Sequence, residues 1–169
     1  TTAGISLQFT LGKMRCMDGK STNITRMNET HYDGLIELWR SFPGNTMTGA
    51  DDRPDFEQFL QSNGDYCFVA LEKGRLAGSV MAGNDKRRGY IYHLAVDQSF
   101  QGKGIGTALM EASENALRKA GIEKVHLFIY SDNPAIRFYS KTGWHVRNDI
   151  TVMSKVLIGD RYLGTRRDD

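Results

Sequence analysis

The spacing of apolar residues alternates along the chain between every second position and every third or fourth position. The first spacing predicts strands with one buried face, and the second predicts helices with one buried stripe. Glycine, proline, asparagine and aspartate gather between these segments and predict turns. The predicted strands cover residues 24–27, 66–72, 75–82, 90–96, 124–130, 144–147 and 150–156, and the predicted helices cover 32–40, a segment that begins at 52 or 54, 105–120 and 134–142.

The first residues of the chain carry a strand pattern of their own. Ile5, Leu7, Phe9 and Leu11 alternate with polar residues, which predicts a strand added to the edge of this sheet or of a neighbouring subunit. Alternatively, the residues before Met14 are vector-derived, because Met14 could be the original start. We therefore expect an N-terminal extension over residues 1–20, one domain over 21–157 and a polar tail over 158–169.

Composition narrows the class of protein. A chain of 169 residues is long enough for one domain with a buried core. The 22 basic and 20 acidic side chains leave a net charge of +2, which gives no indication of nucleic-acid binding. The two cysteines and four histidines do not form a disulfide framework or a zinc site, so we expect no metal. No apolar run reaches membrane-spanning length, and we expect a cytoplasmic protein with no membrane partner.

A glycine-rich stretch from Gln101 to Thr107 lies between the predicted strand 90–96 and the helix that follows. Its three glycines leave backbone N–H groups unshielded, the helix start adds further donors, and Lys103 adds a positive charge. Such a stretch suits a phosphate, and the alternative is a surface turn that happens to be rich in glycine. A Walker loop is excluded because Gly-x-x-x-x-Gly-Lys-Ser/Thr is absent. A dinucleotide fingerprint is excluded because Thr107 replaces its third glycine.

Two motifs in this chain resemble those of one family. The strand end Leu94-Ala95-Val96, followed by Gln-x-x-Gly-x-Gly at 101–106, resembles the pyrophosphate loop of the GCN5-related N-acetyltransferases, the GNAT family. Residues 133–144, Asn-x-Ala-x-x-Phe-Tyr-x-x-x-Gly-Trp, are similar to the closing motif of that family. The resemblance spans about residues 21–157. It implies the GNAT fold, a mixed α/β fold with a mostly antiparallel sheet of six or seven strands, splayed at the cofactor site, and helices on both faces.

The resemblance implies that acetyl-CoA is the cofactor. The backbone of Leu94, Ala95 and Val96 would pair with the pantetheine arm, and Val96 would also polarise the acetyl carbonyl. Asn133 would bond the pantetheine amides, and it could equally cap a helix. The residues that would hold the diphosphate are Gln101, Gly102, Lys103, Gly104, Ile105, Gly106 and Thr107.

Tyr139 matches the family tyrosine whose hydroxyl lies near the coenzyme sulfur. It would protonate the departing thiolate, and the alternative is a tyrosine that packs on Ala135 one turn earlier. The general base stays unassigned, because the sequence lacks both glutamates that family members use. Phe128 stands at one of those positions, and the strand before the glycines offers Tyr92 and His93 instead.

Three aspartates lie in the loop and helix that, in the family, line the acceptor cleft. An amine acceptor with a pKa near about 10 is a cation in water, so acidic groups would help to bind it. The alternative is that these aspartates only favour the start of a helix. The predicted acceptor-binding residues are Asp51, Asp52, Asp55, Tyr92 and His93. The acceptor could be a peptide N-terminus, a lysine, a polyamine, an amino acid or a drug, and a homodimer is a further open prediction.

The function implied is an N-acetyltransferase that moves the acetyl group of acetyl-CoA to a primary amine by direct attack in a ternary complex. Two alternatives stay open. The absent glutamates favour a non-catalytic acetyl-CoA sensor or interaction module, and the glycine-rich stretch alone would also suit an unrelated nucleotide-binding α/β protein. Thiol release with an amine separates the enzyme from the sensor, and tight ATP or NAD binding without coenzyme A binding would indicate the third class.

Overall fold

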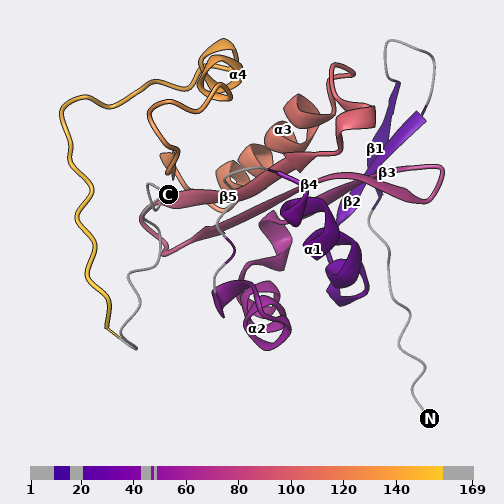
Figure 1. Ribbon diagram of the computed structural model, residues 1–169, viewed down its shortest axis with the longest axis horizontal. Coiled ribbons are helices and arrows are strands. Elements are labelled where there is room, and N and C mark those ends of the chain that lie inside the picture. The colour runs from indigo at the N-terminus through magenta and orange to yellow at the C-terminus, as the bar shows by residue number, and fades with distance from the viewer. Residues whose placement is uncertain (1–9, 16–20, 43–46, 48, 158–169) are drawn as a thin grey trace. The chain divides into compact units, whose positions relative to one another are not determined.

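The computed structural model describes residues 10–15, 21–42, 47 and 49–157 (Figure 1). The chain divides into two compact units, of which the first ends at Leu127 and the second begins at Phe128. Over the described residues, the first unit contains a six-stranded sheet and three α-helices, and the second contains one short α-helix.

The strands of the sheet follow one another in chain order. Each strand pairs antiparallel with the next as far as β5, and β6 pairs parallel with β5. The parallel step requires a long crossover, which contains α3. The expected mixed, mostly antiparallel sheet is therefore confirmed. The strands are β1 (Thr10–Arg15), β2 (Ser21–Arg26), β3 (Phe68–Glu72), β4 (Arg75–Asn84), β5 (Gly89–Val96) and β6 (Val125–Leu127).

Helices cover both faces of this sheet, as expected. Figure 1 shows α1 (Tyr32–Arg40) and α2 (Arg53–Asn63) on one face and α3 (Ile105–Lys119) on the other. None of the helices in the described part of the chain combines the length and the apolar character that crossing a bilayer requires. Short 3₁₀ helices join the elements: η1 (Glu29–His31), η2 (Gly49–Asp51), η3 (Gly64–Tyr66) and η4 (Gln98–Phe100).

The core beneath α1 depends on a stripe of apolar side chains at helical spacing. Leu35, Ile36 and Trp39 are buried on that stripe, and Phe56 of α2 joins them. The indole of Trp39 donates from Nε1 to Ser79 Oγ of β4 at 2.9 Å, which satisfies its polar atom inside the core. This bond attaches α1 to the middle of the sheet.

The pairing of β4 with β5 contains a bulge. Between the pair Ser79–Ala95 and the pair Met81–Tyr92, β4 advances by two residues and β5 by three. His93 lies inside this interval and has a φ of +36°, in the left-handed region that residues with a Cβ seldom adopt. Bulges change the direction of a side chain and bend the strand. His93 therefore departs from the regular alternation of β5.

The two strands predicted at 144–147 and 150–156 are wrong, because the described second unit has no strand there. A strand needs a ladder partner for its N–H and C=O groups, and none of the described residues pairs with this stretch. Its apolar side chains are accordingly exposed, 64% for Val146 and 61% for Val152. For the same reason β6 ends at Leu127, earlier than the predicted 130.

The remaining elements agree with expectation in type and differ in their ends. The helix predicted at 134–142 is α4 (Ile136–Lys141). An added strand is found at the sheet edge as β1, which begins at Thr10, whereas the alternation predicted it from Ile5. Ile5, Leu7 and Phe9 lie outside the described residues. The division into extension, domain and tail stays a prediction.

Gly78 of β4 allows α3 and β5 to approach closely. A Cβ at this position would lie 2.8 Å from the Ala95 carbonyl oxygen and 3.1 Å from Leu109 Cδ1. Because the carbonyl cannot move without disturbing the ladder, we expect Gly78→Ala to lower the free energy of unfolding by ~1–3 kcal/mol. Gly34→Ala is the matched control, since its Cβ would lie 3.4 Å from Leu76 Cδ2 and alanine favours a helix by ~0.5–1 kcal/mol. Denaturant unfolding measures both, and equal stabilities would contradict the close approach.

Candidate functional site

The end of β5 directs a backbone N–H group away from β4. Asp97 N donates to Ala77 O across the ladder at 3.0 Å. Hydrogen-bonded and non-hydrogen-bonded pairs alternate along an antiparallel ladder, so the preceding pair, Val96 with Gly78, is a non-hydrogen-bonded one. The N–H of Val96 therefore points toward the other side of β5.

On that other side, β5 has no pairing strand beyond Ile91 among the strands described in the first unit. The parallel ladder with β6 consists of three pairs and ends at Ile91–Leu127. None of the strands described in the first unit pairs with residues 92–96 on this side. An unpaired strand edge can hydrogen-bond an extended ligand as it would another strand. The ladder ends where the resemblance places the splay at the cofactor site, and the splay itself stays a prediction.

The chain turns from β5 into α3 through η4. Asp97 accepts from Ser99 N at 2.9 Å, and Phe100 N donates to Asp97 O at 2.8 Å. Gln101 Nε2 donates to Val96 O at 3.0 Å. The Gln101 side chain, predicted to hold a diphosphate, thus fixes the loop against the end of β5, and its backbone is the part that would face a ligand.

Two of the three glycines of the loop have a backbone conformation that favours glycine. The φ angles of Gly102 and Gly104 are +74° and +82°. Gly104 is the N-cap of α3, and no side chain caps this helix. The first intrahelical bond runs from Ala108 N to Gly104 O at 3.0 Å, so the N–H groups of residues 105–107 precede it. These groups, at the positive end of the helix dipole, suit the oxygens of a phosphate.

Two cationic side chains lie beside the loop at Phe100. Lys103 Nζ and the Arg75 guanidinium are each 5.1 Å from the centroid of its ring. Arg75 also pairs with Asp97 at 3.2 Å. Lys103 is a predicted site residue and Arg75 is not. The predicted turn at 73–74 puts Arg75 at the start of β4, opposite the end of β5, so the strand register is the signal that could have identified it.

His93 and Asp51 form a close pair, although they are 42 positions apart in the sequence. His93 Nε2 lies 2.6 Å from Asp51 Oδ1, and the side chains are 15% and 9% exposed. The imidazole stacks on the indole of Trp39, with ring centroids 4.3 Å apart and an interplanar angle of 17°. The structure therefore joins two of the predicted acceptor residues in one nearly buried pair.

The other two predicted aspartates lie apart from this pair. Asp52 is the N-cap residue of α2, Asp55 is in its first turn, and both are exposed. Acidic residues there stabilise a helix through its dipole. Arg53 beside them pairs with Asp33 at 2.8 Å. Asp51 is therefore directed into the protein, and Asp52 and Asp55 belong to the surface of α2.

Tyr92 lies between helix α2 and solvent. Its ring meets Phe59 edge to face at 5.8 Å and stacks with Tyr90 at 6.5 Å, and the residue is 41% exposed. Burial, followed by the charges of Tyr90 and Asp85, raises the pKa of Tyr92. Tyr92 is therefore a neutral phenol at physiological pH, able to donate a hydrogen bond.

The second unit contains Asn133 and Tyr139. Asn133 Oδ1 accepts from Ala135 N at 2.9 Å in the turn before α4. The N-cap of α4 is Ala135 and no side chain caps this helix, so the alternative that Asn133 caps it is wrong. The Tyr139 ring packs on Phe138 and Trp144, with centroids 5.2 and 5.9 Å away. Burial raises the pKa of Tyr139 to about 12. The phenol therefore keeps its proton at neutral pH, as a general acid must before it acts.

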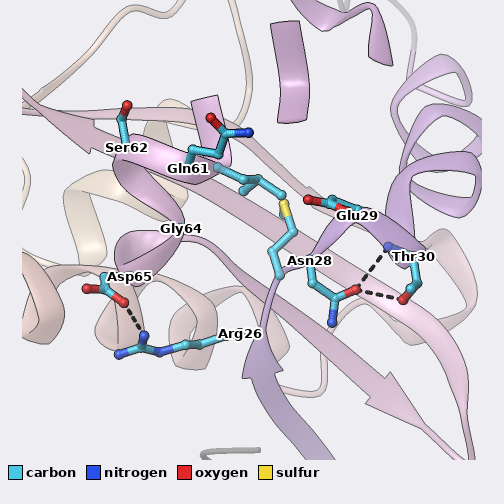
Figure 2. Close-up of a pocket in the computed structure, with 10 residues that line it drawn as sticks. Arg26, Asn28, Glu29, Thr30, Gln61, Ser62, Gly64 and Asp65 are labelled. Atoms are coloured by element: carbon cyan, nitrogen blue, oxygen red, sulfur yellow. Dashed lines mark hydrogen bonds and ion pairs between the residues drawn. The ribbon is translucent and has the colours of Figure 1, made fainter. Parts of the chain in front are cut away.

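A pocket of about 540 Å³ lies elsewhere in the first unit, where the ends of β2, η1, α2 and η3 meet (Figure 2). Arg26 pairs with Asp65 at its wall, and Asn28 Oδ1 accepts from Thr30 N at 3.0 Å. None of the site residues predicted from the motifs lines this pocket. The pocket is therefore distinct from the candidate site at β5 and the glycine loop.

Comparison with known proteins gives a family match and a curated relative. Residues 32–144 match the model of the acetyltransferase (GNAT) family. A protein of Pectobacterium atrosepticum named as an acetyltransferase is 36% identical over 135 residues, which cover 77% of this chain and 92% of that protein.

Solved structures share the fold. The PaiA N-acetyltransferase from Thermoplasma acidophilum, in complex with coenzyme A, has a TM-score of 0.66 at 17% identity, over 75% of this chain and 91% of that one. An aminoglycoside acetyltransferase from an uncultured soil metagenomic sample, in complex with sisomicin, has a TM-score of 0.62 at 24% identity, over 81% of this chain and 97% of that one. At these identities the likeness concerns the fold alone.

Gly106 tests whether the start of α3 holds the diphosphate of coenzyme A. It lies in the first turn of α3, so a valine there enters regular helix and shields the N–H groups around it. We expect Gly106→Val to weaken coenzyme A binding at least ~10-fold, equivalent to about 1.4 kcal/mol, while the melting temperature stays nearly unchanged. Gly106→Ala is the smaller control step. Calorimetric titration gives both affinities, and an unchanged affinity in the valine variant would remove the loop from the site.

Proposed function

This chain belongs to the acetyltransferase (GNAT) family, and from that membership we propose how it binds acetyl-CoA and transfers the acetyl group. The protein is an N-acetyltransferase, and acetyl-CoA is its cosubstrate. The expectations for family, fold, enzyme class and cofactor are thereby confirmed. The individual site residues, the acceptor and the order of the steps are what the proposal adds.

The outward N–H of Val96 is the observation that carries the proposal. An acetyl-CoA whose pantetheine arm lies along the side of residues 92–96 that faces away from β4 would hydrogen-bond the backbone of Leu94 and Val96 in the manner of a strand. Its diphosphate would then accept from the N–H groups of residues 105–107, with Lys103 adding positive charge. In this arrangement the loop binds through its backbone, and Gln101 supports it by its bond to Val96.

The acetyl group would be transferred directly in a ternary complex. The acceptor amine, once neutral, attacks the thioester carbonyl carbon, and the carbonyl becomes a tetrahedral oxyanion. The Val96 N–H would donate to this oxyanion, a contribution of typically ~3 kcal/mol per donor. Collapse of the intermediate breaks the carbon–sulfur bond and releases the coenzyme A thiolate.

Tyr139 is our candidate for the acid that protonates this thiolate. The raised pKa supports it, because the phenol carries its proton throughout the neutral range. The motif supports it too, since Tyr139 stands in the family position whose hydroxyl lies near the coenzyme sulfur.

We propose a primary amine as the acceptor, without naming one. The aminoglycoside acetyltransferase that shares the fold is in complex with sisomicin. That complex supports an amine in general rather than a particular compound. A cytoplasmic location belongs to the same proposal, supported by the free, buried thiol of Cys67. The homodimer stays a prediction.

The reaction is tested by following free thiol during incubation with acetyl-CoA and a mixed amine library, and by identifying the acetylated amine by mass spectrometry. We expect one thiol released for each amide formed. A protein that binds acetyl-CoA and releases no thiol with any amine would contradict the proposed acceptor class.

Tyr139→Phe tests the acid while keeping the ring that packs on Phe138 and Trp144. We expect turnover to fall by ~10²–10⁴, the usual effect of removing a placed acid, with acetyl-CoA affinity nearly unchanged. Single-turnover kinetics measures the chemical step itself. Wild-type rates in this variant would mean that water or another group protonates the thiolate. Phe138→Leu controls for altered packing on the same helix.

A further inference from the structure

We propose that His93 takes the proton from the acceptor ammonium, directly or through one water molecule, and that Asp51 is the positioning residue that orients His93. This inference rests on the proposed function. It fills the place left by the glutamates that the sequence lacks. Three observations carry it: the contact between the two side chains, the stack on Trp39 and the backbone conformation of His93.

The contact determines which nitrogen of the ring is available. Asp51 Oδ1 lies 2.6 Å from His93 Nε2, and an ionised carboxylate only accepts hydrogen bonds. Nε2 must then carry the hydrogen, which leaves the lone pair of the neutral ring on Nδ1. No hydrogen bond to Nδ1 is found among the described residues. Nδ1 is therefore the proton acceptor, in the arrangement that a carboxylate imposes on a catalytic histidine.

Both neighbours of the ring interact more strongly with it once it is protonated. The Asp51 carboxylate then faces a full positive charge, and its side chain is only 9% exposed, so water screens the attraction weakly. The face of Trp39 attracts a cation that lies over it, and the two rings are 4.3 Å apart. Trp39 is in turn held by its bond to Ser79, so the platform is rigid.

The backbone of His93 supports a functional reading. Among the described residues, three that are not glycine have positive φ: Lys73, Lys86 and His93. Lys73 lies in the β3–β4 turn and Lys86 in the β4–β5 turn, where such angles are ordinary. His93 alone of these three lies inside a strand, at the bulge. Conformations of this kind cost energy, and they concentrate at active sites because the surrounding structure maintains them there.

The location of His93 also suits the reaction. It is three residues before Val96 on β5, which corresponds to at most ~10 Å of strand. The proton balance closes as follows: the ammonium loses one proton to Nδ1, the amine nitrogen loses a second after attack, and the thiolate takes one. One proton per turnover goes to solvent.

His93→Gln is the decisive variant. The Gln amide can keep a donor near Asp51, as Nε2 does, but it cannot accept a proton at neutral pH. We expect turnover at pH 7 to fall by ~10²–10⁴, with acetyl-CoA affinity and melting temperature nearly unchanged. The deficit should shrink as the pH approaches about 10, because the amine is then neutral without a base. His145→Gln, at an exposed histidine of the second unit, is the matched control and should behave as wild type.

The described residues that contact His93 define what else could shape the pH profile. Asp51 is the ionisable group that faces it from η2, while Trp39 of α1 and Ser79 of β4 carry no charge. Tyr32 of α1 donates from its hydroxyl to the Asp51 carbonyl oxygen at 3.1 Å. A deficit that does not change between pH 7 and 10 would therefore indicate a structural role and overturn the proposal.

Asp51→Asn separates positioning from substrate binding. If Asp51 orients His93, kcat falls and the acceptor KM stays nearly unchanged. If Asp51 binds the ammonium instead, the acceptor KM rises with kcat unchanged, and the proposed role is overturned. Asp33→Asn, at an exposed aspartate of α1, is the matched control. It should leave both parameters within about 2-fold, as surface charges usually do.

The wild-type protein provides a measurement that does not depend on any variant folding. Nitrogen-15 correlation spectra of its histidines should show the neutral His93 ring protonated at Nε2, and a ring protonated at Nδ1 would overturn the proposal. The two levels of inference fail differently. No thiol release by the wild type with any amine contradicts the proposed function, whereas wild-type turnover in His93→Gln contradicts only the role of His93.

Discussion

The register between β4 and β5 is the constraint on which the candidate site depends. The residue added by the bulge shifts everything after it on β5 by one position relative to β4. That shift directs the N–H of Val96 to the side away from β4, while Asp97 bonds Ala77. Because N–H groups alternate in direction along a strand, a ladder without the bulge would turn Val96 inward and Ala95 outward. One backbone irregularity thus sets the directions of His93 and of the Val96 N–H together.

The pair of His93 and Asp51, which lies at this bulge, is poorly explained by a contribution to stability alone. Removing a carboxylate and an imidazole from water costs more than a well-packed apolar pair would, and a buried ion pair is weak evidence for stabilisation. Here the pair also lies on a rigid support, because Trp39 is bonded to Ser79 and stacked on His93. It connects η2, α1 and β5, three segments that the acceptor would approach together. Such an arrangement suits a group whose orientation matters more than its contribution to folding.

Local features of this chain could be predicted from its sequence, and features that depend on distant partners could not. The glycine loop, α1 and α3 follow from short-range spacing, and each is found where it was predicted. The strands predicted at 144–147 and 150–156 are absent from the described residues. Alternation of apolar and polar residues indicates which face of a strand would be buried, and it does not show whether another strand is there to pair with it. The contact of Asp51 with His93 spans 42 positions and depends on the bulge, for which the sequence carries no periodic signal. The sequence gives no reason to distinguish Asp51 from Asp52 and Asp55, and the structure distinguishes it because Asp51 alone of the three is buried.

The two candidate proton-transfer groups have environments suited to opposite tasks. Apolar burial raises the pKa of Tyr139 to about 12, so its phenol holds a proton and is a poor anion. His93 has a carboxylate against Nε2, so that a proton arriving at Nδ1 leaves no charge unpaired. Acid and base roles are separated in enzymes by such contrasts. A phenolate formed at Tyr139 would be a strong base and would recover its proton before the next turnover. In the proposed cycle, Tyr139 therefore starts each turnover protonated.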